Sequence, residues 1–156
     1  MHVFRFANGA VERLTDHSGV HTARVGGATI VVRSATMHEP RAITRVKSES
    51  SGGTNHVIAN NAEMPLLLPN VTLHAVGTHS VQCALLLPSN YDGGALPVLC
   101  DPYGGPHAQR VVSAQSAYLS AQWFAEQGFA VVIADGRGTP GRGSAWERDV
   151  HLDVST

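Results

Sequence analysis

The sequence predicts a chain in two parts, an antiparallel β-rich region up to about residue 47 and a mixed α/β region from about residue 69. Three observations support this division. Short β-rich runs separated by turn signals such as Asn8-Gly9 and Gly26-Gly27 fill the first part. Small polar residues without a clear period occupy 48–63. Beyond them the pattern changes to a hairpin and then to alternating strand, helix and strand.

The first part carries five runs that we expect to be strands, at 2–6, 11–14, 20–25, 28–34 and 42–46. Their near-even spacing is typical of an antiparallel meander, as in one blade of a β-propeller or part of a sandwich. One such unit cannot complete a closed core by itself. We interpret residues 48–68 as a linker to the second part.

The second part opens with a hairpin, since residues 71–76 and 81–87 flank a short turn. Residues 96–100 and 129–134 then predict two buried strands. A helix is expected between them, with Ser113 as its N-cap and Gly128 as its end. The residues at helical spacing are Ala114, Ala117, Tyr118, Ala121, Phe124 and Ala125. A βαβ unit after an antiparallel hairpin gives a mixed sheet, which is how an α/β-hydrolase sheet begins.

Composition limits the classes of function. Hydrophobic residues make up 43% of the chain and charged residues 15%, which is typical of a folded domain. The formal net charge of -1 does not favour nucleic acid or an anionic membrane as a partner. The longest apolar run, 129–134, is far shorter than a membrane span, and no leader opens the sequence. We therefore expect a cytoplasmic protein.

The cysteines and histidines do not form a recognisable metal pattern. Cys83 and Cys100 lie in apolar runs, so we expect buried free thiols rather than a disulfide or a metal site. His17 and His21 are four residues apart, but the Ser-Gly pair between them breaks any helix that would align them. The sequence predicts neither a metal nor a cofactor.

The loop after the first strand of the βαβ unit, Asp-Pro-Tyr-Gly-Gly-Pro-His at 101–107, is the first candidate site. In an α/β-hydrolase this loop contributes to the oxyanion hole. Glycines allow close approach to a substrate, prolines stiffen the loop, and Tyr103 offers a hydroxyl donor. Composition alone leaves open, and slightly favours, an ordinary tight turn with the tyrosine packed over it.

The motifs at 96–107, at 122–143 and at 146–148 (Trp-Glu-Arg) are specific in combination. Together they resemble the prolyl oligopeptidase family of serine peptidases, and within it the dipeptidyl peptidase IV branch. The resemblance in motifs covers about residues 96–148, whereas residues 1–95 resemble the family in layout only. It implies the last strands of a β-propeller at 1–47, the linker at 48–68, and the N-terminal half of an α/β-hydrolase domain at 69–156.

The same resemblance implies roles for individual residues. Tyr103 takes the role of oxyanion donor, and Gly104, Gly105 and Pro106 belong to the substrate-binding loop. Asp135, Gly136, Arg137 and Gly138 form a structural turn after the fourth strand of the sheet. Arg137 and Arg142 are expected to tie loops together by ion pairs and hydrogen bonds.

A competing motif is present, because residues 136–141 satisfy the Gly-x-Gly-x-x-Gly pattern of dinucleotide-binding proteins. That pattern must open directly into a helix that receives the pyrophosphate. Here Pro140, Gly141 and Gly143 keep the backbone irregular until about Ser144. The chain also ends before an acidic ribose ligand could be placed. Nucleotide binding is therefore not favoured.

A serine hydrolase of this fold needs its nucleophile in a Gly-x-Ser-x-Gly turn, followed by an aspartate and a histidine. No such turn occurs in the 156 residues, so we expect all three catalytic residues outside this segment and no activity from the chain alone. The paired glutamates that hold the substrate amino terminus in the resembled branch are also missing, since Glu12, Glu39, Glu49 and Glu63 are isolated.

For the full-length parent, the resemblance implies a serine peptidase that cleaves peptide substrates after proline or alanine near the amino terminus. A homodimer is also an expectation for that parent. Two alternatives remain open. One is an acylaminoacyl-peptidase or esterase of the same fold, and the other is a non-catalytic remnant or binding module.

Overall fold

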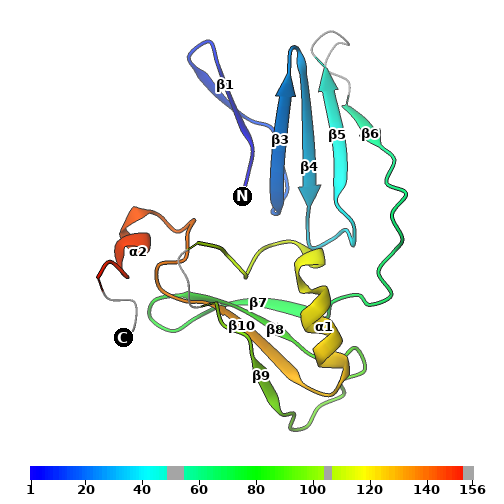
Figure 1. Ribbon diagram of the computed structural model, residues 1–156, viewed down its shortest axis with the longest axis vertical. Coiled ribbons are helices and arrows are strands. Elements are labelled where there is room, and N and C mark those ends of the chain that lie inside the picture. The colour runs from blue at the N-terminus through cyan, green and yellow to red at the C-terminus, as the bar shows by residue number, and fades with distance from the viewer. Residues whose placement is uncertain (49–54, 104–106, 153–156) are drawn as a thin grey trace. The chain divides into compact units, whose positions relative to one another are not determined.

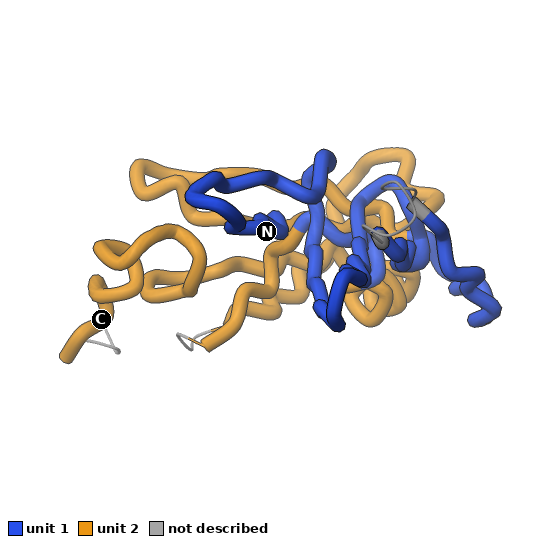
Figure 2. The backbone as a smooth tube through the Cα atoms, turned by 90° about the horizontal axis from the view of Figure 1, so that it is seen from above, with its two compact units in different colours: residues 1–68, 113–116 blue, residues 69–112, 117–156 orange. Residues whose placement is uncertain are grey.

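The computed structural model describes residues 1–48, 55–103 and 107–152 (Figure 1). The chain divides into two compact units, shown in different colours in Figure 2. Unit 1 consists of residues 1–68 and 113–116, and unit 2 of residues 69–112 and 117–156. Both units are built mostly from open sheets, and the described residues form no closed barrel.

Unit 1 begins with a separate two-stranded hairpin, β1 (Phe4–Ala7) and β2 (Ala10–Arg13). Its two-residue turn has positive φ at both positions, 53° at Asn8 and 76° at Gly9. An Asn-Gly pair accepts this backbone with little strain, and its twist matches that of the flanking strands. The turn predicted from the sequence is confirmed.

A four-stranded antiparallel meander follows in unit 1. Its strands are β3 (Val20–Gly26), β4 (Thr29–Ala35), β5 (Ile43–Ser48) and β6 (Asn55–Ile58), in that spatial order. The sequence did not predict β6, which lies inside the segment interpreted as a linker. Its residues pair in register with β5, as in Val57 opposite Arg45. Backbone pairing with a neighbour therefore makes a strand of a segment whose composition lacks a clear period.

Unit 2 contains a mixed sheet with the order β7-β8-β10-β9. The strands β7 (Val71–Val76) and β8 (Val81–Leu86) form the predicted antiparallel hairpin. The strands β9 (Val98–Cys100) and β10 (Ala130–Asp135) are parallel, as expected for a βαβ unit. Because β10 inserts between β8 and β9, it has a partner on both sides and β9 is left at the edge.

The crossover between β9 and β10 is shorter as an α-helix than the sequence predicted. It starts as a 3₁₀ turn (Gln115–Tyr118) and continues as α1 (Leu119–Glu126). Ser113 is not the N-cap of α1, because the 3₁₀ turn separates it from the helix and Tyr118 holds that position without a side-chain cap. The predicted end is confirmed, with Gly128 at φ 94°. A short second helix, α2 (Ser144–Arg148), follows β10.

The core of unit 2 lies between α1 and one face of the sheet. Alternate residues of β10 are buried, as are facing residues of β8, because strand side chains point to opposite faces in turn. The buried apolar residues of this unit are Ala84, Leu86, Tyr118, Ala121, Ala125, Val131 and Ile133. Gln122 is also fully buried, and its amide bonds the N–H of Asn70 and the carbonyl of Leu87. It thereby links the residue before β7 and the residue after β8 to α1.

The two cysteines are free thiols, but the prediction that both are buried was wrong. Cys83 on β8 is half-buried. Cys100 is exposed, because it belongs to the edge strand β9. An apolar run in the sequence does not distinguish an edge strand from a central one.

Prediction from the sheet edge. The strand β9 offers unpaired backbone groups and an apolar side chain, Val98, that is 60% exposed. Such an edge favours pairing with another chain, so we expect the 156-residue chain to form oligomers in light scattering. Val98→Lys should shift the population towards monomer. The matched control is Leu66→Lys, which removes a fully exposed leucine outside any strand and should leave the association unchanged. If the unsubstituted 156-residue chain is monomeric, the prediction is wrong.

Candidate active site

The loop that carries Tyr103 begins as an extension of β9 along β10. The N–H of Asp101 donates to the carbonyl of Val132 at 2.8 Å, and the N–H of Tyr103 donates to that of Ala134 at 3.3 Å. Tyr103 also forms an isolated parallel bridge with Asp135. Tyr103 therefore lies at the carboxyl ends of two parallel strands, the edge at which α/β sheets bind ligands.

The Tyr103 side chain is half-buried. In the described part of the chain, nothing forms a hydrogen bond with its hydroxyl. Among the described residues, no group therefore competes with a ligand for this donor. The neighbouring Gly104, Gly105 and Pro106, predicted to belong to the same loop, lie outside the described residues.

A buried carboxylate anchors the far end of this loop. Asp135 is the last residue of β10 and is only 3% exposed. Its Oδ1 accepts the N–H of Arg110 at 2.9 Å, and its Oδ2 accepts the N–H of Val111 at 3.0 Å. Two charge-assisted bonds to backbone donors compensate for the burial of a carboxylate. The sequence placed Asp135 in a structural turn but did not identify these partners.

The loop is also closed by an ion pair between Asp101 and Arg110. The guanidinium donates through Nη1 to Oδ1 of Asp101 at 3.1 Å and through Nη2 to Oδ2. The hydrogen bonds that the guanidinium donates to Asp101 raise the pKa of Arg110 above its ordinary value. Sequence reasoning missed both residues as site elements. The only signal was an acidic and a basic residue at the two ends of a loop rich in proline and glycine.

Past the loop, Val112 is tied to Tyr118. The Tyr118 hydroxyl accepts the N–H of Val112 at 2.9 Å and donates to the carbonyl of the same residue at 2.8 Å. The tyrosine is fully buried. Burial disfavours the phenolate and raises the pKa of Tyr118 to about 12. These two hydrogen bonds fix the position of the backbone at Val112, before the crossover helix.

Hydrogen bonds between residues of the turn after β10 fix its conformation. The carbonyl of Gly136 accepts bonds from the Thr139 N–H at 3.4 Å and from its hydroxyl at 2.7 Å. Gly138 has φ 79°, and an added Cβ would lie 2.4 Å from a methyl group of Val150. Only glycine fits there, because the backbone is left-handed and the space is filled.

Two arginines make the kind of loop contact that the resemblance implied. Arg137 pairs with Asp149 at 3.7 Å. Arg142 donates to the carbonyl of His79 at 2.9 Å and lies over the Trp146 ring at 3.7 Å from its centre. The glycines at 136–141 do not open directly into a helix, since α2 begins only at Ser144. This arrangement does not match a dinucleotide fingerprint.

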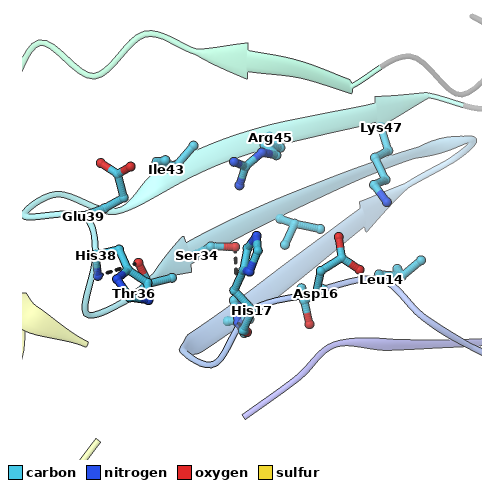
Figure 3. A pocket seen from close by; sticks show the side chains of 13 residues that line it. Leu14, Asp16, His17, Ser34, Thr36, His38, Glu39, Ile43, Arg45 and Lys47 are labelled. Atoms are coloured by element: carbon cyan, nitrogen blue, oxygen red, sulfur yellow. Dashed lines mark hydrogen bonds between the residues drawn. The ribbon is translucent and has the colours of Figure 1, made fainter. Parts of the chain in front are cut away.

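A separate pocket of ≈ 340 Å³ lies in unit 1 (Figure 3). One buried polar side chain of its lining, His21, bonds Ser34 Oγ at 2.9 Å through Nδ1 and the His17 carbonyl at 2.9 Å through Nε2. With both ring nitrogens engaged, His21 is a core histidine. Among the residues that the structure describes, no group of three or more His, Cys, Asp and Glu side chains could hold a metal ion.

A known protein family matches the part of the chain that contains the motifs at 122–143 and 146–148. Residues 115–156 match the model of the prolyl oligopeptidase family. This match confirms the resemblance indicated by the sequence motifs. In the described part of the chain, neither helix has the length and apolarity to cross a bilayer.

Solved structures of two proteins have a similar fold. One is the dipeptidyl peptidase 4 of Porphyromonas gingivalis, with a TM-score of 0.76 and 21% identity over 94% of this chain. The other is a protein from Bacteroides ovatus ATCC 8483 assigned as a dipeptidyl aminopeptidase IV, with a TM-score of 0.70 and 20% identity over 92% of this chain. The chain spans 22% of the length of each.

Prediction for Asp135. Asp135→Ala should leave two buried N–H groups without acceptors and lower the free energy of unfolding by about 3 kcal/mol. Urea denaturation monitored by tryptophan fluorescence measures the change. Asp92→Ala removes an exposed aspartate and should change the same quantity by about 0.5 kcal/mol or less. Equal effects of the two variants would show that Asp135 is not an anchor.

Prediction for Tyr118. An ultraviolet absorbance titration should show a phenol that ionises only near pH 12, and Tyr118→Phe should remove that late step. An unfolded chain releases the same proton near 10.0. Between these two pH values the folded state binds more protons, so the free energy of unfolding should fall as the pH rises. A late step that persists in Tyr118→Phe would contradict the assignment.

Proposed function

We propose that this chain is part of a serine peptidase of the dipeptidyl peptidase IV-like branch, and that Tyr103 donates its hydroxyl to the oxyanion formed during peptide hydrolysis. The observation that carries the proposal is that Tyr103 lies at the carboxyl ends of β9 and β10 and that its hydroxyl has no hydrogen-bond partner among the described residues. The family match at 115–156 begins just beyond the same loop.

The proposal includes a finer assignment of the fold. The mixed sheet of unit 2 has an antiparallel pair followed by a parallel crossover, which fits the first half of an α/β-hydrolase domain. The meander β3 to β6 has the four antiparallel strands of a propeller blade. The similarity in fold to the two dipeptidyl peptidase structures supports both assignments.

The chemistry follows from the position of the donor. When a serine attacks a peptide carbonyl, negative charge develops on the carbonyl oxygen, and a hydrogen-bond donor held in place stabilises that charge. Tyr103 supplies such a donor, while the serine, aspartate and histidine come from sequence other than this segment. We propose peptides with proline or alanine near the amino terminus as substrates, in keeping with the resembled branch.

Prediction for Tyr103. In a full-length enzyme that carries this segment, Tyr103→Phe keeps the ring but removes the donor. We expect kcat to fall by about 10² to 10³, equivalent to about 2.7 to 4 kcal/mol, because the lost bond is strongest in the transition state. KM and the melting temperature should change little. Steady-state kinetics with Gly-Pro and Ala-Pro amide substrates measure the effect.

Tyr91→Phe is the matched control. The Tyr91 hydroxyl donates to the carbonyl of Gly94 at 2.7 Å, so this variant removes an exposed turn contact in the same unit. Its kcat should equal that of the parent. If Tyr103→Phe also keeps kcat within about threefold of the parent on folded protein, the proposed role of Tyr103 is wrong.

A further inference from the structure

The segment that carries Tyr103 is closed by a bidentate ion pair. Asp101 follows β9 directly, and Arg110 lies nine residues later. The guanidinium engages both carboxylate oxygens of Asp101, while the backbone N–H of Arg110 is held by Asp135 at 2.9 Å. Arg110 is therefore fixed by its side chain and its backbone at once. Through it, the start of the loop is connected to the end of β10.

Because the ion pair is partly exposed, its effect on the stability of the fold differs from its effect on the placement of the loop. The side chains of Arg110 and Asp101 are 37% and 44% exposed. Ion pairs exposed to this degree contribute little to folding. The two parallel bonds of an arginine fork nevertheless fix the orientation of the carboxylate relative to the guanidinium. Loss of the pair should therefore alter the placement of the loop more than the stability of the fold.

Tyr103 depends on the residues before it for its position. The hydrogen bond from its backbone N–H to the carbonyl of Ala134 is 3.3 Å long, which exceeds the usual range for N–H to oxygen bonds. The corresponding bond of Asp101, to Val132, is 2.8 Å. Asp101 is thus the firmer attachment of this stretch to β10. Its side chain is held by Arg110, so a shift at Asp101 would carry Tyr103 with it.

We propose that Asp101 and Arg110 are positioning residues that hold the Tyr103 hydroxyl at the distance the oxyanion requires. This inference rests on the function proposed for Tyr103. An oxyanion donor must lie about 2.7 to 3.1 Å from the developing charge. A displacement of about 1 Å can reduce catalysis by about 10². A charged fork at the base of the loop limits displacement of this kind.

A double-mutant cycle in a full-length enzyme that carries this segment tests the proposal. Arg110→Met, which removes the fork, is made alone and together with Tyr103→Phe. Alone, it should lower kcat about tenfold, within the limit set by a displacement of about 1 Å, with KM changed about twofold or less. In the Tyr103→Phe background, the same substitution should cost about twofold or less, because the donor it positions is already absent.

Two more variants test the ion pair in case Arg110→Met does not fold. Asp101→Asn removes the charge at the other end of the pair and should give the same pattern of kcat and KM. Arg110→Lys keeps the charge without the fork, so its kcat should lie between those of the parent and Arg110→Met. The matched control is Arg5→Met, which breaks the ion pair between Arg5 and Glu12. The Arg5 side chain is 38% exposed, about as much as that of Arg110, and the substitution should leave kcat unchanged.

The outcomes are distinct. If Tyr103→Phe lowers kcat but Arg110→Met and Asp101→Asn do not, the positioning inference is overturned and the role of Tyr103 stands. If the two effects multiply in the double variant, the pair acts on something other than Tyr103, and the inference is again overturned. A melting temperature that falls strongly in Arg110→Met, with the same loss of kcat in both backgrounds, indicates a structural role only. If Tyr103→Phe has no effect, both proposals fail.

Discussion

The buried carboxylate of Asp135 is the constraint on which the loop geometry depends. A charged group that is 3% exposed must be matched by donors, and two consecutive backbone N–H groups, of Arg110 and Val111, supply them. Those groups belong to the far end of the loop that begins at β9. If the loop moved away from the end of β10, this carboxylate would lose both of its backbone donors.

The strand order makes this contact possible. Because β10 lies between β8 and β9, the loops that follow the two parallel strands emerge side by side at one edge of the sheet. An added Cβ at Gly141 would lie 2.9 Å from the Gln109 side chain, which shows how closely the two loops approach. The two motif segments, separated along the sequence by the crossover helix, thus form one surface.

Local signals in the sequence predicted the local structure well. The Asn-Gly pair at residue 8 and the four-residue turn at 77–80 identified hairpins, because their backbone requirements are met within a few residues. Helical spacing likewise located the crossover and its end at Gly128. The strand β6 and the exposure of Cys100 were not predictable in this way. Both depend on which strand pairs with which, and that is a property of the assembled sheet.

The candidate site shows the same limit. The sequence singles out the motif around Tyr103, because glycine, proline and tyrosine each have a local conformational or chemical meaning, and the role of Tyr103 stays a prediction. The partners of Asp135 could not be read, since a carboxylate at the end of an apolar run has no sequence signal for its distant donors. The pairing of Asp101 with Arg110 is likewise a consequence of loop closure rather than of spacing.

The two acidic residues that hold the loop, Asp101 at its start and Asp135 at the end of β10, act through different physical effects. Asp135 is buried, so its hydrogen bonds bear on the free energy of folding. Asp101 is partly exposed, where water and salt screen its attraction to Arg110, so the pair affects orientation more than stability. The role proposed for Tyr103 needs both effects. In that proposal, the buried Asp135 holds the far end of the loop, and the ion pair of Asp101 with Arg110 sets the direction in which the loop leaves β9.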